Sequence, residues 1–174
     1  MAARFLALAG APIILMDFAT LQSRVACMGP LHIEKGIDEQ GNPGAWVALD
    51  PGAKPVFVAQ HHWIGVDLDG TLARDDAAGH FLPPYPLGEP IPEMVEMVKS
   101  LLAAGVTVKI FSARACEPQS IPIIQAWAEK HGLGRLEVTN QKDYDLIRFY
   151  DDRAIQMLPN QGKPVSRLAN GTPG

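Results

Sequence analysis

The chain has 174 residues, of which 47% are hydrophobic, and it carries a formal net charge of −4. This length and composition suffice for one good hydrophobic core, and we expect a single domain around it. The excess of acidic residues argues against a broad nucleic-acid-binding surface, although it is compatible with a local basic groove.

Cysteine usage and hydropathy favour a cytoplasmic protein. Cys27 and Cys116 have neither metal-ligand nor redox spacing, which is typical of a reduced compartment. The longest apolar stretch, residues 5–16, contains a glycine and a proline and is too short to span a bilayer. With Arg4 as its only positive flank, the stretch is a poor match to a signal peptide.

Residues 1–62 are predicted to form an N-terminal extension, a small β-rich appendage that packs on the remainder of the chain. Residues 5–24 are consistent with an irregular helix. Short strands are predicted at residues 31–34, 46–49 and 56–59. The turn-rich sequence Gly41-Asn42-Pro43-Gly44 lies between the first two strands. Met28 is an alternative start of the natural chain, and the sequence leaves that choice open.

An apolar run at residues 63–66 predicts a buried strand, and the pentad Asp67-Leu68-Asp69-Gly70-Thr71 follows it. Two carboxylates spaced i and i+2, where a strand passes into a loop, can both turn toward one site. Gly70 permits backbone geometry that a residue with a Cβ resists. Such a pair can hold a divalent cation while one carboxylate attacks an electrophile and the other moves protons. Calcium loops and ordinary turns also contain Asp-x-Asp-Gly.

The adjacent histidines just before this strand, His61 and His62, invite a metal-binding interpretation. Neighbouring side chains at the entry to a strand are expected to project apart, however. We therefore interpret the pair as structural.

The remaining elements alternate between helix and strand. One helix is predicted from Pro92 to Ala104, ending at Gly105, and a second from Ile121 to His131. Strands are predicted at residues 106–112, 136–139 and 146–152. This alternation implies an α/β fold with a parallel sheet and right-handed crossovers. The tail at residues 159–174 is rich in glycine, proline, asparagine and serine, and we expect it to be flexible.

Three of these segments add polar groups to the pentad at the carboxyl edge of the predicted sheet. Ser112 ends the second strand, Lys142 follows the third, and Asp151 and Asp152 end the fourth. Ligands of open α/β sheets bind at this edge. Because the edge then carries four carboxylates, an anionic substrate requires a bound cation and Lys142 to offset their charge.

Each of these residues also has a plainer interpretation. A serine after a strand is commonly a cap, and an isolated lysine is commonly a solvated surface residue. Arg114, close to Ser112, could bind a substrate phosphate or carboxylate, and a salt bridge within the loop fits the pattern equally well.

The order Asp-x-Asp-Gly-Thr, strand-Ser, Lys, strand-Asp-Asp resembles the haloacid dehalogenase (HAD) superfamily of aspartyl phosphotransferases. The resemblance covers residues 63–158 and implies a Rossmann-like catalytic core there. It implies that Asp67 is the nucleophile that attacks phosphorus and that Asp69 is the general acid and base. Two details depart from the commonest pattern: Ser112 stands where threonine is usual, and Asp143 follows Lys142 where proline is frequent.

The resemblance also implies a Mg²⁺ cofactor and a phosphate site. The metal ligands would be Asp67, the main-chain carbonyl of Asp69, and Asp151 and Asp152, with the direct ligand of the last two left open. Ser112 and Lys142 would hold the transferring phosphoryl oxygens, joined in one interpretation by Arg114.

Similar enzymes often carry a cap domain over the site, but this chain leaves no room for one. The two insertion points, residues 72–87 and 113–141, have only 16 and 29 residues. We expect an open site, covered only if the N-terminal extension or a second subunit of a homo-oligomer closes it. The implied substrates are phosphorylated small molecules or exposed nucleic-acid and sugar phosphates, with no membrane partner.

The predicted function is a Mg²⁺-dependent phosphomonoester hydrolase that acts through an aspartyl-phosphate intermediate. A phosphoacceptor switch similar to a response-regulator receiver is one alternative, since it also combines clustered acids, a hydroxyl and a lysine. Receivers lack the Asp-x-Asp-Gly-Thr arrangement with its second aspartate, and the presence of that arrangement in this chain counts against the switch. A non-catalytic binding protein on the same fold is the other alternative.

Overall fold

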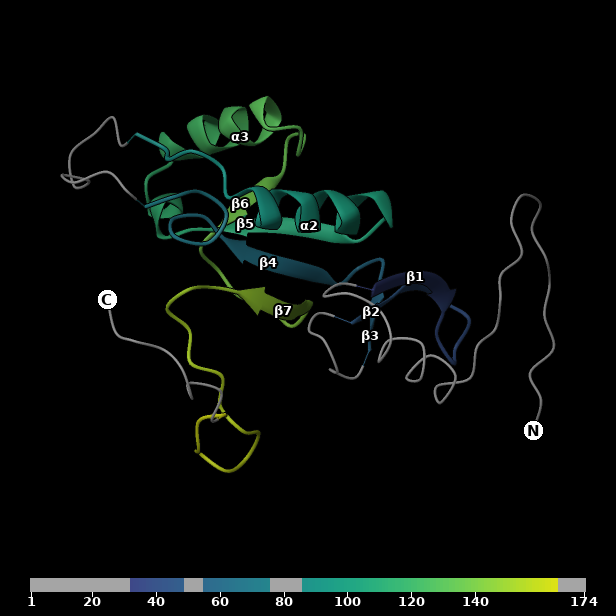
Figure 1. Ribbon diagram of the computed structural model, residues 1–174. Coiled ribbons are helices and arrows are strands. Elements are labelled where there is room, and N and C mark those ends of the chain that lie inside the picture. The colour runs from purple at the N-terminus through teal and green to yellow at the C-terminus, as the bar shows by residue number, and fades with distance from the viewer. Residues whose placement is uncertain (1–31, 49–54, 76–85, 166–174) are drawn as a thin grey trace.

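The computed structural model describes residues 32–48, 55–75 and 86–165. The expected helix at residues 5–24, the alternative start at Met28 and the end of the predicted tail lie outside these ranges. The described residues form two sheets, one antiparallel and one parallel, and two helices pack on the parallel sheet (Figure 1).

The parallel sheet confirms the expected α/β class. Its strands are β4 (Trp63–Asp67), β5 (Thr107–Phe111), β6 (Glu137–Thr139) and β7 (Leu146–Tyr150). They lie in the order β6-β5-β4-β7, and every neighbouring pair is parallel. Strand β4 is therefore a central strand, and the pentad that follows it emerges at the middle of the carboxyl edge.

Two helices lie on the same side of the parallel sheet, in a separate layer (Figure 1). Helix α2 (Pro92–Ala103) packs on β5, and α3 (Ser120–Lys130) packs on β6. The apolar residues of α2 recur at helical spacing, and Val95, Val98 and Leu101 are buried. Among the helices of the described residues, none has the length and apolar character needed to cross a membrane.

The predicted cap insertion points differ in what the structure describes. Between β5 and β6, the fully described residues 112–136 hold only the 3₁₀ helix η1 (Ala113–Cys116) and α3. At the other point, residues 76–85 lie outside the described ranges.

The face of the sheet opposite the helices contains an aromatic pair. The rings of Phe111 on β5 and Phe149 on β7 meet edge to face, with centroids 4.7 Å apart. They meet across β4, which lies between their strands, because Gly65 has no side chain there. A Cβ at Gly65 would lie 2.9 Å from Phe149 Cδ2. The glycine in the middle of β4 is thus required by packing rather than by backbone conformation.

The N-terminal extension contains the three predicted strands. They are β1 (His32–Ile37), β2 (Pro43–Ala48) and β3 (Val56–Ala59), in an antiparallel sheet of that order. Pro43 and Gly44, expected in the turn, instead begin β2, because Asp38 closes the turn earlier. Its carboxylate accepts hydrogen bonds from the N–H groups of Gln40 and Asn42, at 2.9 and 2.8 Å.

A single hydrophobic core joins the two sheets. Ala45, Val47 and Val58 of the antiparallel sheet belong to the same buried cluster as Ile64 and Val66 of β4. The extension is therefore integrated with the parallel sheet through shared apolar contacts.

After β7 the chain forms a small hairpin across the predicted start of the tail. Met157 and Pro164 form a bridge, and the N–H of Leu158 donates to the carbonyl of Lys163 at 2.7 Å. Asn160, with φ of 60°, lies in the turn. Residues 156–165 therefore have defined backbone structure, and the expected boundary between residues 158 and 159 falls inside the hairpin.

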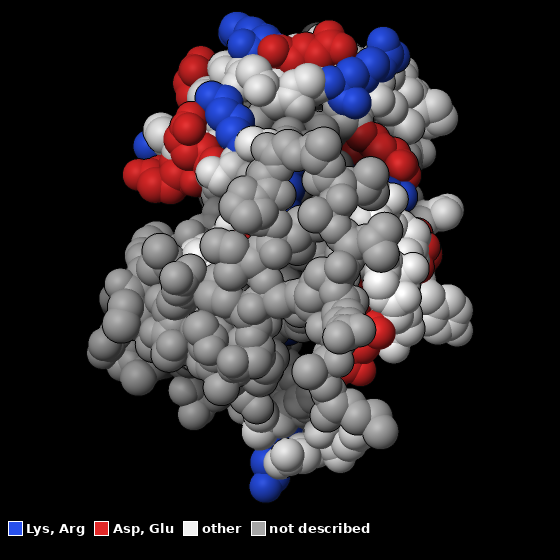
Figure 2. All heavy atoms as spheres, turned by 90° about the vertical axis from the view of Figure 1, so that its right-hand side faces the viewer, with Lys and Arg blue, Asp and Glu red and all other residues white. Residues whose placement is uncertain are grey.

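The described charges are of mixed sign on the face shown in Figure 2. Lysine and arginine side chains lie beside aspartate and glutamate side chains at the upper end of that view. This mixture fits the modest net charge of −4.

Candidate active site

Asp67, at the carboxyl end of β4, is the centre of a group of acidic side chains. Its pKa is raised from 3.8 to about 6, chiefly by burial and to a smaller extent by the negative charges of Asp151, Asp152 and Asp69. A hydrogen bond from the backbone N–H of Leu68 acts in the opposite direction. The electrostatic effect of three other carboxylates on Asp67 means that the fold brings all four predicted acids to one edge of the sheet.

The pentad is held in a compact turn after β4. Leu68 and Leu72 are completely buried, and the Leu68 carbonyl accepts hydrogen bonds from the N–H groups of Leu72 and Ala73, at 3.0 and 2.7 Å. The N–H of Gly70 donates to the Ala73 carbonyl at 2.8 Å. Burial of the leucines therefore anchors the turn, while Asp67 and Asp69 retain partial exposure.

Gly70 has two structural reasons to be glycine. Its φ of +89° is a conformation that side chains with a Cβ rarely adopt. A Cβ there would also lie 2.7 Å from Oδ2 of Asp152. The end of β7 thus packs directly against the pentad, and the N–H of Asp152 donates to Oγ1 of Thr71 at 3.1 Å.

Asp151 and Asp152 have different surroundings. The Asp151 carboxylate accepts a hydrogen bond from the N–H of Arg153 at 2.8 Å and is partly buried. Asp152 is exposed, and Arg153 Nε lies 3.9 Å from its carboxylate. Both acids raise the pKa of Asp67, as expected for residues just beyond the regular strand.

Arg114 forms the loop salt bridge that the sequence left as one of two interpretations. Its Nε and Nη2 donate to the two carboxylate oxygens of Asp69, each at 2.7 Å. Both side chains are largely buried, with 14% and 20% of their surfaces exposed. A bidentate guanidinium pair fixes both the position and the plane of the carboxylate. Arg114 therefore connects η1 to the pentad.

Ser112 lies at the expected edge but serves as a cap. Its Oγ accepts a hydrogen bond from the N–H of Arg114 at 3.2 Å and so caps η1. Only 1% of the residue is exposed. The hydroxyl is thus positioned beside the loop that carries Arg114, beneath the surface of the site.

Lys142 rests on aromatic rings. Its Nζ lies 5.2 Å from the ring centroid of Phe149 and 5.9 Å from that of Phe111. Phe111 is the register partner of Asp67, so the ammonium lies on the sheet face toward which Asp67 points. Within the described part of the chain, however, Lys142 forms no ion pair with Asp67.

The acidic group has the donor chemistry of a magnesium site. All its ligand atoms are oxygens, and a divalent cation would offset the burial and the smaller repulsion that together raise the pKa of Asp67. No three of these carboxylates bring one oxygen each within 4.8 Å, as judged over the described residues. Mg²⁺ commonly uses one or two carboxylates and completes its shell with water, so it does not require three carboxylates this close together.

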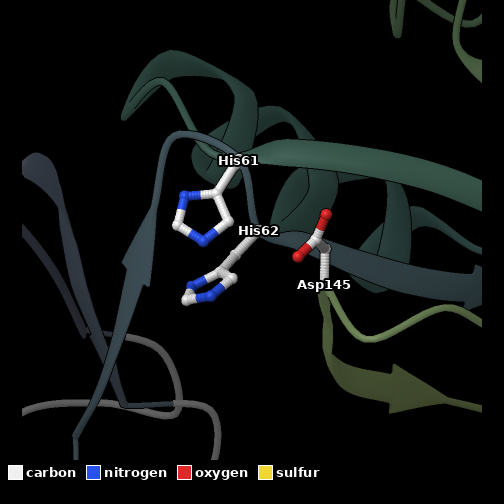
Figure 3. A group of neighbouring side chains, drawn as sticks. All are labelled: His61, His62 and Asp145. Carbon is white, nitrogen blue, oxygen red and sulfur yellow. The ribbon is translucent and has the colours of Figure 1, made fainter.

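A second group of side chains contradicts the expectation that His61 and His62 project apart. Their ring centroids lie 4.1 Å apart, and Asp145 completes a group whose ligand atoms all lie within 4.8 Å of one another (Figure 3). The expectation failed because both histidines lie in the turn between β3 and β4, where strand alternation does not apply. Sequence signals could not identify Asp145, because it is brought in by the pairing of β7 with β4.

Comparison with known proteins yields no match: no family model, no curated protein and no solved structure corresponds to this chain. The fold and the site define an α/β protein with a parallel four-stranded sheet. Four aspartates gather at the carboxyl edge of that sheet, around the end of its central strand β4.

Proposed function

We propose that the protein is a Mg²⁺-dependent phosphomonoester hydrolase of the HAD type, acting through an aspartyl-phosphate intermediate. The observation that carries the proposal is the position and charge of Asp67. It ends a central strand of a parallel sheet, and burial, followed by the charges of three other aspartates, raises its pKa. A carboxylate crowded in this way requires a cation before an anionic substrate can approach.

In the proposed reaction, Asp67 attacks the phosphorus atom. An Asp67 Oδ–P bond forms while the bond from phosphorus to the leaving oxygen breaks, and Asp69 gives that oxygen a proton. Asp69 then removes a proton from water as the water attacks phosphorus, which releases inorganic phosphate and restores the Asp67 carboxylate. Mg²⁺, held by Asp67, the Asp69 carbonyl and Asp151 or Asp152, would neutralise charge on the phosphoryl group.

Arg114 gives this proposal a specific requirement. The bidentate pair with Arg114 holds Asp69 as an acceptor of two hydrogen bonds. A protonated Asp69 can accept fewer such bonds, so proton transfer requires the pair to loosen. Arg114 then sets where the Asp69 carboxyl lies, and Lys142 must swing from its aromatic rings to reach a phosphoryl oxygen.

The same contact favours a second candidate, a phosphoacceptor protein similar to a receiver. If Asp69 stays paired with Arg114, Asp67 can still be phosphorylated while hydrolysis of the product is slow. In both candidates the phosphate donors are small molecules or exposed phosphate groups, because residues 112–136 supply no cap domain.

The first experiment measures phosphate release from an aryl phosphate and from a panel of phosphate monoesters. We expect turnover with Mg²⁺, loss of turnover with a chelator, and no turnover in Asp67→Asn. Near wild-type turnover in Asp67→Asn would rule out the nucleophile assignment. Absence of turnover with every substrate would instead favour a phosphoacceptor protein or a non-catalytic binding protein.

The second experiment separates hydrolase from switch by the lifetime of the acyl phosphate. The protein is labelled with an activated phosphodonor at saturating Mg²⁺, and decay is followed in the wild type, Asp69→Asn and Arg114→Gln. A hydrolase should have a fleeting intermediate that becomes trappable only in Asp69→Asn. Arg114→Gln removes the same ion pair but keeps the carboxyl group, so it controls for loss of the pair. A long-lived wild-type intermediate, unchanged in Asp69→Asn, would favour the switch.

A further inference from the structure

The cluster of His61, His62 and Asp145 lies at the opposite edge of the parallel sheet from the candidate active site. The two histidines immediately precede β4, and Asp145 immediately precedes β7, which pairs with β4. Figure 3 shows the two imidazoles one above the other, with the Asp145 carboxylate beside them. The cluster therefore joins the turn after β3 to the entry of β7.

The backbone around this cluster is fixed by hydrogen bonds. The N–H of His62 donates to the Ala59 carbonyl at 3.0 Å, and the N–H of Trp63 donates to the Asp145 carbonyl at 2.9 Å. The Asp143 carboxylate adds a link by accepting from Trp63 Nε1 at 2.7 Å and from the N–H of Asp145 at 2.9 Å. The three side chains are thus brought together by strand pairing and by a buried tryptophan.

We propose that His61, His62 and Asp145 bind a Zn²⁺ ion that fastens the antiparallel sheet to the amino edge of the parallel sheet. Two imidazole nitrogens and one carboxylate oxygen are a typical donor set for zinc, whereas Mg²⁺ prefers oxygen ligands alone. Water would occupy the fourth position. The site is chemically and spatially distinct from the aspartates around Asp67.

Binding requires a modest closure of the cluster. Ligand atoms of a tetrahedral Zn²⁺ shell with bonds of about 2.0–2.1 Å lie roughly 3.3 Å apart. The present limit of 4.8 Å between ligand atoms leaves a small contraction, which rotation of the exposed His61 and Asp145 and the partly buried His62 can supply. The backbone–backbone hydrogen bonds around the cluster need not change for this rotation.

One hydrogen bond must be lost when His62 takes the metal. The N–H of Ala59 now donates to Nδ1 of His62 at 3.2 Å. Coordination through Nδ1 uses the lone pair that accepts this bond. Coordination through Nε2 moves the imidazole proton to Nδ1, which then faces the Ala59 N–H. Either mode releases the Ala59 amide, which gives zinc binding at this cluster a local signature.

The test is titration of the tag-free full-length chain with Zn²⁺, followed by calorimetry. With saturating Mg²⁺ present to occupy the acidic group, we expect one Zn²⁺ ion per chain, with affinity lowered by at least about tenfold in His61→Ala, His62→Ala and Asp145→Asn. His131→Ala removes a histidine outside the cluster and Asp67→Asn alters the acidic site, and both should bind as the wild type does. Loss of binding in Asp67→Asn but not in His61→Ala would overturn the proposal by assigning the ion to the acidic group.

A second measurement is independent of affinity. Zn²⁺ should shift the amide resonance of Ala59 and speed its hydrogen exchange, and should raise the melting temperature of the wild type through mass action. His62→Ala should lose all three responses. If Zn²⁺ binds without changing the Ala59 amide, or does not bind the wild type, the proposed site is wrong.

Discussion

At the scale of single residues, Asp67 is a side chain whose ionisation opposes folding. Its folded-state pKa of about 6 lies above the ordinary 3.8, so the folded protein retains a proton that the unfolded chain has released between those values. Stability therefore falls as the pH rises from about 4 to about 6, and the full cost persists at higher pH. Allowing for partial exposure, the cost is roughly 2 kcal/mol, since one pKa unit corresponds to about 1.4 kcal/mol.

This cost predicts the behaviour of Asp67→Asn in the presence of a chelator. The variant should be more stable than the wild type by roughly 2 kcal/mol near neutral pH, because it has no charge to bury. The difference should shrink as the pH falls from about 6 and disappear well below pH 3.8, where the wild-type side chain is protonated in both the folded and the unfolded state. Denaturant unfolding across this pH range measures it. A difference that does not change with pH would show that charge burial is not its cause.

Gly70 permits a second prediction with a matched control. Gly70→Ala and Gly105→Ala place a Cβ at similar φ values of +89° and +84°, and each should cost about 1–2 kcal/mol in unfolding free energy. Only at Gly70 does the new Cβ meet the Asp152 carboxylate, since Gly105 has no atom within 4 Å of that position.

Gly70→Ala should therefore also displace Asp152 and lower the pKa of Asp67 toward its ordinary value. Carboxyl-carbon NMR titration measures this pKa in both variants. An Asp67 pKa that shifts equally in Gly105→Ala would mean that backbone strain, and not the position of Asp152, is responsible.

At the scale of elements, the two faces of β4 make different contacts. Ile64 and Val66 belong to the apolar core, and the helices cover that core. Gly65 on the other face leaves room for the Phe111–Phe149 pair, and Asp67 ends the same face at the site. The five residues of β4 thus supply core contacts on one face. On the other face they supply the space in which the two phenylalanine rings meet and the candidate nucleophile.

This arrangement predicts an unusual response to Gly65→Ala. In a strand interior, alanine is ordinarily favoured over glycine by roughly 0.5–1 kcal/mol. Here we expect a loss of about 1–3 kcal/mol, because the Cβ would press on Phe149 at 2.9 Å. A double-mutant cycle with Phe149→Ala measures the coupling, and the cost of Gly65→Ala should shrink in that background. An unchanged cost would assign the loss to another neighbour.

At the scale of the whole molecule, the two sheets share one core. Val47 on β2 is fully buried in the cluster that also contains Ile64 of β4. The antiparallel sheet should therefore not unfold independently of the parallel sheet, although the sequence suggested an appendage at residues 1–62 and a catalytic core at 63–158.

Val47→Ala tests this cooperativity. The variant should lose about 2 kcal/mol of unfolding free energy in one transition, because the cavity weakens a core that both sheets use. Tryptophan fluorescence, from Trp46 on β2, Trp63 on β4 and Trp127 on α3, and circular dichroism should report the same midpoint. Separate midpoints would show that the sheets unfold as two units.

The sequence by itself determined the elements of this protein and their order. Helix α2 ends one residue before the expected Ala104, and α3 starts and ends one residue before its expected limits. All seven strands within the described residues overlap predicted ones, since alternation of apolar residues and glycine or proline punctuation act locally. The placement of Asp67, Asp69, Asp151 and Asp152 at one edge followed from strand ends, because parallel strands share a carboxyl edge.

Only the tertiary structure decided the partners of these residues. Arg114 meets Asp69 across 45 positions of sequence, and Asp145 meets His62 because β7 pairs with β4. Lys142 rests on two aromatic rings whose contact depends on a glycine in the strand between them. Local patterns fix which segments form and which ends carry polar groups. Which side chains these polar groups contact depends on strand register and on the space left by neighbouring side chains. Register and space are set only when the strands have paired and the core has packed.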